Sequence, residues 1–312
     1  MRTGTDLGGS NRLPAHYCGL VGFKPTHGRI PQTGSFPDIT ARHMHVGPLA
    51  KSVRDVALAL SLMEGPDHED IHAAQMPRLP PMDRIVGECP SGLRIGVSDE
   101  GPFAPVSHAV RGVVREAADA LRRLGHQVLD IDARLAGCPD SIAVCFDLLG
   151  AEAPHFFAPV TGRADAGGLD ERLSAGVVGL LEPEQPTLEQ YLSALDARDG
   201  VDKLITNLFA DFDLLLLPTA PCVAPLHDDA PVEVDGVAVE PGHAALITAT
   251  FGLTGHPALS LPFGATADGL PVGVQMVAAK SADALLLQAA HALEQVAPFS
   301  GAHPPLAEPA KL

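Results

Sequence analysis

The chain has 312 residues, of which 46% are hydrophobic, and a formal net charge of −17 at pH 7. That length and apolar content suffice for a large α/β core. The 21 basic residues are scattered, so the positive patch of a nucleic-acid-binding protein is missing. No apolar run reaches the roughly eighteen residues of a membrane span, and the N-terminus lacks the features of a signal peptide. We therefore expect a soluble, cytoplasmic protein without nucleic-acid or membrane partners.

The cysteine and histidine patterns predict neither disulfides nor a metal site. The 5 cysteines are widely spread, with no C-x-x-C pair and no zinc-ligand spacing. Such a pattern is typical of reduced, mostly buried thiols. The 14 histidines form no H-E-x-x-H motif. We expect no metal and no cofactor.

The first predicted element is a glycine-rich loop near the N-terminus. Residues 4–10 read GTDLGGS, so that a hydroxyl follows two adjacent glycines. Glycines let the backbone approach a ligand closely and can point successive N–H groups into one concavity. An oxyanion hole and a serine nucleophile can share such a loop. The same letters also describe an ordinary flexible turn, and the continuation of the sequence favours the catalytic interpretation.

That continuation carries a family resemblance. Residues 4–31 read GTDLGGSNRLPAHYCGLVGFKPTHGRIP, which closely resembles the signature region of the amidase signature family of serine hydrolases. The resemblance implies that Ser10 is the nucleophile. It further implies an oxyanion hole made by the backbone N–H groups of Leu7, Gly8, Gly9 and Ser10.

Neighbouring residues are expected to support this loop. Asp6 and Arg12 are interpreted as an ion pair that holds it rather than as groups that take part in the chemistry. Thr5 lies where the family braces a second serine in a cis peptide. Asn11 stands where an apolar side chain usually follows the nucleophile. Of two roles for its amide, altering the pocket or facing solvent, we expect the second.

The general base is missing from this stretch. In the family the base is a neutral lysine that acts through the cis serine, and both precede the nucleophile. Residues 1–9 contain neither a lysine nor a serine. We therefore expect residues 1–312 to form a single but partial amidase-signature domain whose N-terminal portion is absent.

Lys24 and several histidines are alternative bases by residue type alone. Pro25 follows Lys24, which does not fit a phosphate-binding loop, and structural anchoring is the expected role of this lysine. Histidine titrates nearest to neutral pH, but isolated loop histidines are usually polar surface residues, and no spacing directs one at Ser10. The histidines considered are His16, His27, His43 and His45.

Beyond the signature, the chain alternates helices and strands. A capping box at Ser52 predicts an amphipathic helix that covers a sheet face and ends at Gly65. Four prolines in residues 77–92 indicate an irregular linker. A strand at 93–97, a helix at 107–124 and a strand at 127–131 then form a parallel βαβ unit.

The second half begins with the stretch that is hardest to interpret. Residues 135–185 show no clear periodicity, and the family resemblance implies that they help to line the substrate pocket. A capping box at Thr187 starts a helix, with a second start near Val201 left open. The apolar run 213–218 predicts a central strand buried on both faces.

The last elements are a hairpin, two core strands and a helix. Residues 232–239 alternate in polarity around Asp-Gly, which predicts a tight turn. Two core strands are expected at 257–262 and 270–277, followed by a helix from 281 to 296 that closes the fold.

The C-terminal part also resembles the family. Residues 254–262 read TGHPALSLP and residues 269–275 read GLPVGVQ. Gly252 departs from the family, which commonly has asparagine there, and this puts a local hydrogen bond in doubt. The implied fold is α/β, with an amidase-signature-type mixed β-sheet core covered by helices on both faces and truncated at its N-terminus.

We therefore expect an amidase-type hydrolase that cleaves the C–N bond of a small-molecule carboxylic amide through an acyl-enzyme on Ser10. Two alternatives stay open: an inactive remnant that only binds amide-like ligands, and an A-type subunit of a tRNA-dependent amidotransferase. Losing the N-terminal portion would uncover apolar faces. For that reason the isolated chain is expected to be poorly soluble or to form a homo-oligomer.

Overall fold

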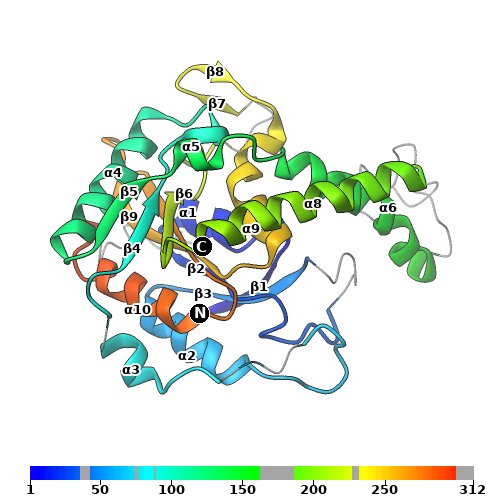
Figure 1. The fold of residues 1–312 in the computed structure, drawn as a ribbon, viewed down its shortest axis with the longest axis horizontal. Helices are drawn as coiled ribbons and strands as arrows, with labels where there is room; N and C mark the ends of the chain where they lie inside the picture. Colours follow the sequence, from blue (N-terminus) through cyan, green and yellow to red (C-terminus); the bar gives the residue numbers. More distant parts are fainter. Residues whose placement is uncertain are drawn as a thin grey trace, which may run out of the picture.

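A mixed sheet of eight strands organises the structure, a computed structural model that describes residues 1–35, 43–73, 76, 78–87, 89–161, 186–226 and 232–299 (Figure 1). The strand order is β1-β3-β2-β9-β10-β6-β4-β5. The strands are β1 (Arg2–Asp6), β2 (Val21–Lys24), β3 (His45–Ala50), β4 (Arg94–Val97), β5 (Gln127–Asp130), β6 (Leu214–Pro218), β9 (Ala258–Ala265) and β10 (Pro271–Ala278). All neighbours are antiparallel except β4, which runs parallel to both β5 and β6.

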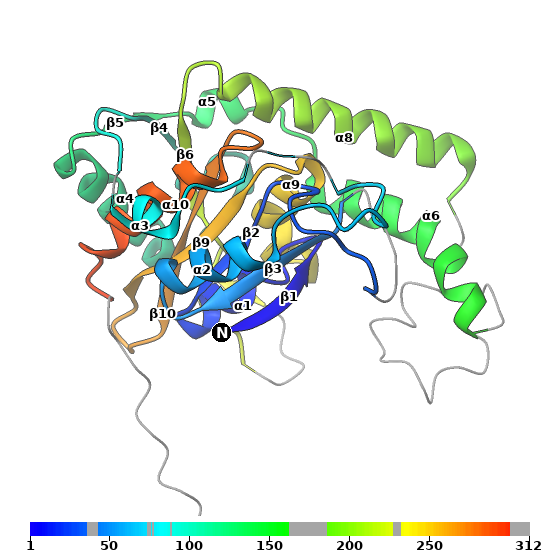
Figure 2. The same cartoon turned by 90° about the horizontal axis from the view of Figure 1, so that it is seen from below.

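Helices cover both faces of this sheet, as expected (Figures 1 and 2). On β10 the side chain of Gln275 reaches α1, whereas on neighbouring β9 a Cβ at Gly264 would meet Val113 of α4 on the opposite face. The helices are α1 (Arg12–Cys18), α2 (Val53–Met63), α3 (Met82–Gly87), α4 (His108–Arg123), α5 (Asp132–Leu135), α6 (Ser141–Thr161), α8 (Leu188–Leu208), α9 (Leu246–Thr254), α10 (Asp283–Glu294) and two 3-10 turns, η1 (Gly101–Phe103) and η2 (Pro241–Ala245). None of the described helices combines the length and apolar content needed to cross a bilayer.

The apolar run predicted as a central strand is β6. All five of its residues are buried, and it lies between β10 and β4. A strand covered on both faces has no solvent side, so its sequence is continuously apolar rather than alternating. The prediction is confirmed.

Truncating this strand is expected to be costly. The side chain of Leu216 is 0% exposed, and Leu216→Ala would leave a cavity that destabilises the chain by about 2–5 kcal/mol. The matched control is Leu129→Ala on β5, where the leucine is 54% exposed and the expected cost is below about 1 kcal/mol. Urea unfolding followed by circular dichroism measures both. Equal losses in the two variants would contradict the central position of β6.

The local signals at helix ends and turns are also confirmed. The Ser52 and Ser107 side chains accept hydrogen bonds from the backbone at the starts of α2 and α4. β4, α4 and β5 form the expected parallel βαβ unit. Asp235 and Gly236, with φ of 50° and 80°, turn the hairpin between β7 (Glu233–Val234) and β8 (Val237–Ala238).

Two predictions need correction. Residues 77–92 are not an entirely irregular linker, because they contain α3, which packs against α2 and α10. Ile85 anchors that helix, with only 1% of its surface exposed. A helix of six residues is too short to show a helical periodicity in its sequence. The helix that starts at the Thr187 capping box does not restart near Val201, which is itself buried within one continuous α8.

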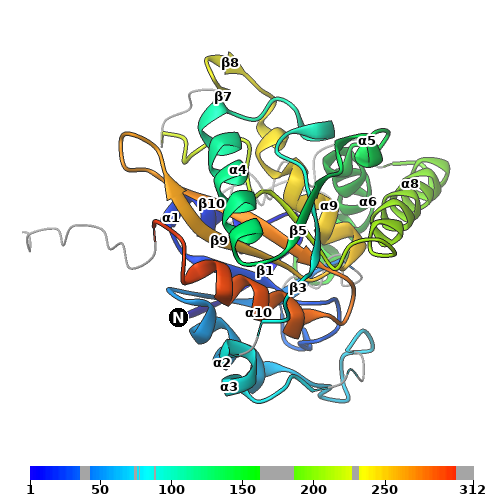
Figure 3. The same ribbon diagram turned by 60° about the vertical axis from the view of Figure 1, so that its left-hand side comes forward.

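The long helices α6 and α8 lie side by side and extend away from the sheet (Figures 1 and 3). Together with α9 they enclose a small apolar cluster, separate from the main core around the sheet. The buried members of this cluster are Val144, Cys145, Leu148, Ala194 and Leu253. Of the middle stretch 135–185, residues 162–185 lie outside the described residues.

Candidate active site

The glycine-rich loop connects β1 to α1, at the edge of the sheet. Ser10 is exposed in the last turn before α1, and Gly9, with φ of 130°, makes the bend that precedes it. A residue with a side chain rarely adopts that φ. A Cβ at Gly9 would also lie only 2.2 Å from the hydroxyl oxygen of Thr248. The second glycine is therefore required by both its backbone angle and its surroundings.

Asp6 holds the backbone on both sides of Ser10. Its carboxylate accepts a hydrogen bond from Gly9 N–H at 2.8 Å and another from Asn11 N–H at 3.2 Å. Arg12 donates to the same carboxylate from Nε at 2.9 Å and from Nη2 at 2.7 Å. The structure thus brings together the two residues interpreted as an ion pair, and both are completely buried.

The charge state of Asp6 follows from this pairing. Burial alone would raise the pKa of the Asp6 carboxyl, but the charge and hydrogen bonds of Arg12 outweigh it and hold the pKa below its ordinary value. Arg12 also donates from Nη1 to Gln275 Oε1 at 2.8 Å. Because Gln275 lies on β10, near the middle of the sheet, the nucleophile loop is fixed to the core through this chain of contacts.

The remaining loop residues have different surroundings. Leu7 is half-buried and packs against the apolar cluster between α6, α8 and α9. Thr5 is exposed on β1, where it pairs with Val46 of β3.

The expectation that the Asn11 amide faces solvent is wrong. It is 1% exposed, and its Nδ2 donates to the carbonyl oxygens of Gly4 at 3.3 Å and Gly47 at 3.2 Å. The amide bridges β1 and β3 from inside, a role that sequence reasoning missed because both acceptors are backbone atoms.

The interpretation of the loop histidines as surface residues is wrong for His16, His43 and His45, which are 0%, 2% and 3% exposed. His16 Nδ1 accepts from Gly273 N–H at 2.9 Å, and Nε2 donates to the Cys222 carbonyl at 3.1 Å. Burial lowers the pKa of His16 to about 4, so the ring is neutral near pH 7. Backbone partners satisfy the ring, which explains how a histidine fits the interior.

Lys24 is buried as well, and its Nζ donates to the Pro25 carbonyl at 3.1 Å. Burial and the nearby Arg12 guanidinium hold the pKa of Lys24 well below its ordinary value. Its hydrogen bond to the adjacent residue agrees with an anchoring role. All five cysteines are free thiols, but only Cys145 and Cys222 are buried, so the expectation of mostly buried thiols is wrong.

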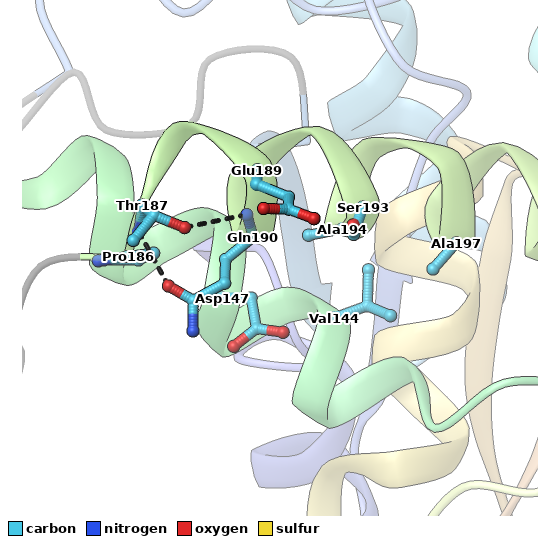
Figure 4. A pocket seen from close by; sticks show the side chains of 9 residues that line it. All are labelled: Val144, Asp147, Pro186, Thr187, Glu189, Gln190, Ser193, Ala194 and Ala197. Atoms are coloured by element: carbon cyan, nitrogen blue, oxygen red, sulfur yellow. Dashed lines mark hydrogen bonds between the residues drawn. The ribbon is translucent and has the colours of Figure 1, made fainter.

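A pocket of about 640 Å³ lies between α6 and α8 (Figure 4). Val144 and Asp147 of α6, from the middle stretch, line one side of it and face Glu189 and Ala194 of α8. Ser10 is not among the lining residues. The described residues contain no group of histidine, cysteine and carboxylate side chains placed to hold a metal ion.

The protein therefore has an α/β fold and exposes Ser10 on a glycine turn that Asp6 holds through two backbone hydrogen bonds. The sequence model of the family described as Amidase matches residues 1–287. The chain belongs to this amidase family of enzymes.

Its relatives differ in activity. The glutamyl-tRNA(Gln) amidotransferase A subunit of Synechococcus sp. (strain CC9311) is 31% identical, over 96% of this chain and 64% of the relative. The 6-aminohexanoate-cyclic-dimer hydrolase of Pseudomonas sp. (strain NK87) is 33% identical, over 99% of this chain and 65% of the relative. The chain therefore spans slightly less than two thirds of the length of these curated relatives.

Solved structures share the fold. A bacterial aryl acylamidase of the amidase signature family superposes with a TM-score of 0.83 at 25% identity, over 96% of this chain and 62% of that one. A 6-aminohexanoate cyclic dimer hydrolase complexed with substrate gives a TM-score of 0.82 at 28% identity, over 97% and 66% of the two chains. The sheet and helices described above are thus the amidase signature fold.

Proposed function

We propose that this chain carries the nucleophile and the oxyanion-binding loop of a cytoplasmic amidase that hydrolyses small carboxylic amides. The observation that carries the proposal is the exposure of Ser10 on a loop whose flanking amides are tied to Asp6. Among the described residues, none accepts a hydrogen bond from the backbone N–H of Gly8 or Ser10. Two donors beside an exposed hydroxyl are what an acyl-transfer site needs.

The reaction follows from these groups. Ser10 Oγ attacks the amide carbonyl carbon while a base takes its proton, and the loop amides stabilise the negative oxygen of the tetrahedral intermediate. The C–N bond then breaks, and the proton is delivered to the departing amine. Water attacks the resulting ester in the same way, releasing the carboxylic acid and restoring Ser10.

The base in this proposal is the lysine that acts through the cis serine, as the family resemblance implies, supplied by a segment outside residues 1–312. Lys24 is a poor substitute because its Nζ is buried and donates to Pro25. His16 is equally unsuitable, since both of its ring nitrogens are engaged with backbone groups.

A second candidate has a specific observation in its favour. Several relatives with about 30% identity are amidotransferase A subunits. In that case Ser10 would perform the same attack within a complex, and the chain would co-purify with partner subunits at fixed stoichiometry. Isolation of an active chain without partners would favour the free amidase instead. Light scattering would show whether such a chain forms a homo-oligomer.

A serine-directed fluorophosphonate probe tests the proposal. We expect it to label Ser10 in the product of the complete reading frame that contains residues 1–312, because only an activated serine attacks the phosphorus rapidly. Peptide mass spectrometry locates the label, and heat-denatured protein is the control. Labelling at another serine, or no labelling of an extended protein that contains the upstream lysine and serine, would overturn the proposal.

A further inference from the structure

Helix α9 packs against α6 and α8 and also contacts the nucleophile loop through Thr248 and Gly252. Its residue Thr248 donates a hydrogen bond from Oγ1 to the Gly8 carbonyl oxygen at 2.6 Å. The Ala245 carbonyl lies at 3.0 Å from the same hydroxyl. A threonine hydroxyl has one proton, and the shorter contact directs it at the loop. Thr248 is therefore a partner of a residue 240 positions away in the sequence.

One turn further along α9, Gly252 faces the same loop. A Cβ at this position would lie 1.8 Å from the Leu7 carbonyl oxygen, a distance that no side chain can accept. The asparagine expected from the family resemblance would not fit this arrangement. Glycine at position 252 allows the Leu7 carbonyl to approach the helix backbone closely.

These contacts fix the directions of the Gly8, Gly9 and Ser10 amides, because the C=O and N–H of a trans peptide point to opposite sides. The Gly8 carbonyl is held by Thr248, and the N–H of the same peptide, on Gly9, is held by Asp6 at 2.8 Å. The Gly8–Gly9 peptide is thus held by hydrogen bonds at both its C=O and its N–H. Its N–H is directed at Asp6 and is not available to a substrate.

The two flanking peptides are directed differently. The Leu7 carbonyl faces α9 at Gly252, so the Gly8 N–H points away from α9. The Gly9 carbonyl accepts from Leu13 N–H at 2.7 Å within the start of α1, so the Ser10 N–H points away from α1. Of the four amides named from the sequence, the Gly9 N–H donates to Asp6, whereas no described residue accepts a hydrogen bond from the N–H of Leu7, Gly8 or Ser10.

We propose that Thr248 is a positioning residue that holds the Gly8–Gly9 peptide against Asp6 and thereby excludes the Gly9 N–H from the oxyanion hole, which leaves the N–H groups of Leu7, Gly8 and Ser10. The catalytic consequence rests on the function proposed for Ser10. The orientation of the peptide does not, so the two can be tested separately.

Backbone hydrogen exchange tests the orientation without any activity. Thr248→Val removes the donor and places a methyl group where the hydroxyl now lies 2.6 Å from the Gly8 oxygen. We expect Gly9 N–H to exchange about tenfold faster, as for loss of one buried hydrogen bond. Thr248→Ser keeps the hydroxyl and is expected to keep the protection. NMR or fragment-resolved deuterium exchange measures both, and exchange in the core strand β6 is the internal reference.

Three outcomes would overturn the positioning role. Gly9 exchange could be unchanged in Thr248→Val, it could rise only together with exchange in β6, or Thr248→Ser could fail to preserve it. In a protein that hydrolyses amides, the role further predicts that Thr248→Val lowers kcat with little change in KM, because the oxyanion forms only in the transition state. If the wild type is inert toward the serine-directed probe, the proposed function fails while the exchange result still decides the geometry.

Discussion

Replacing Ser10 by alanine is expected to lower kcat/KM for a simple carboxamide by about a thousandfold to a millionfold, the range found when a nucleophile is removed from a serine hydrolase. Because Ser10 is exposed and its side chain makes no hydrogen bond to the described residues, the fold should lose less than about 0.5 kcal/mol. A selective loss of chemistry would separate a catalytic serine from a structural one.

Ammonia or amine release from aliphatic and aromatic amides measures this effect in the complete reading-frame product. Ser91→Ala is the matched control, since Ser91 is exposed in a loop between α3 and β4. Full activity in Ser10→Ala would show that another group attacks the substrate. Absence of activity in the wild type, with correct folding, would favour the ligand-binding remnant.

Asp6→Asn should have the largest effect on stability. Asparagine has no charge to pair with Arg12, which is completely buried, and its NH₂ group would face the N–H of Gly9 or Asn11 in place of an acceptor. Leaving one member of a buried ion pair unpaired costs about 3–5 kcal/mol. Chemical unfolding at pH 7 measures the loss. The control Asp268→Asn lies in an exposed loop and should change stability by less than about 0.5 kcal/mol.

The same substitution gives a pH signature. The pKa of Asp6 is lower in the folded chain than its ordinary value of 3.8, so the folded state is stabilised by the ionised carboxylate at any pH above that value. This stabilisation is lost as the pH falls through the folded pKa. The difference in unfolding free energy between wild type and Asp6→Asn should therefore be constant near neutrality and shrink only below about pH 4. A difference that disappears between pH 6 and 8 would point to another group.

The elements that could be predicted from the sequence have local causes. Ser52 and Thr187 cap helices within three residues, Asp235 and Gly236 make their own turn, and the apolar run of β6 reflects burial on both faces. The resemblance over residues 4–31 supplied the candidate nucleophile. Each of these signals lies within a short window of the chain, which is why periodicity and motif spacing detect it.

What escaped prediction depends on contacts between distant segments. The burial of His16 is one case, because nothing near it in the sequence indicates Gly273 or Cys222 as its partners. The contact of Thr248 with the loop that carries Ser10 is another, since the two segments are far apart in the sequence. The use of Gly9 N–H by Asp6 could not be foreseen either, since a motif gives the order of amides but not their directions.

The loop that carries Ser10 belongs to two separately packed parts of the molecule. Asp6 is tied through Arg12 to the central sheet, whereas the next residue, Leu7, is seated among the helices α6, α8 and α9. Any movement of α6, α8 and α9 relative to the sheet would therefore act on the peptide between Asp6 and Leu7, close to the bend at Gly9. The position of Ser10 therefore depends on helices built from residues far along the chain as well as on the sheet.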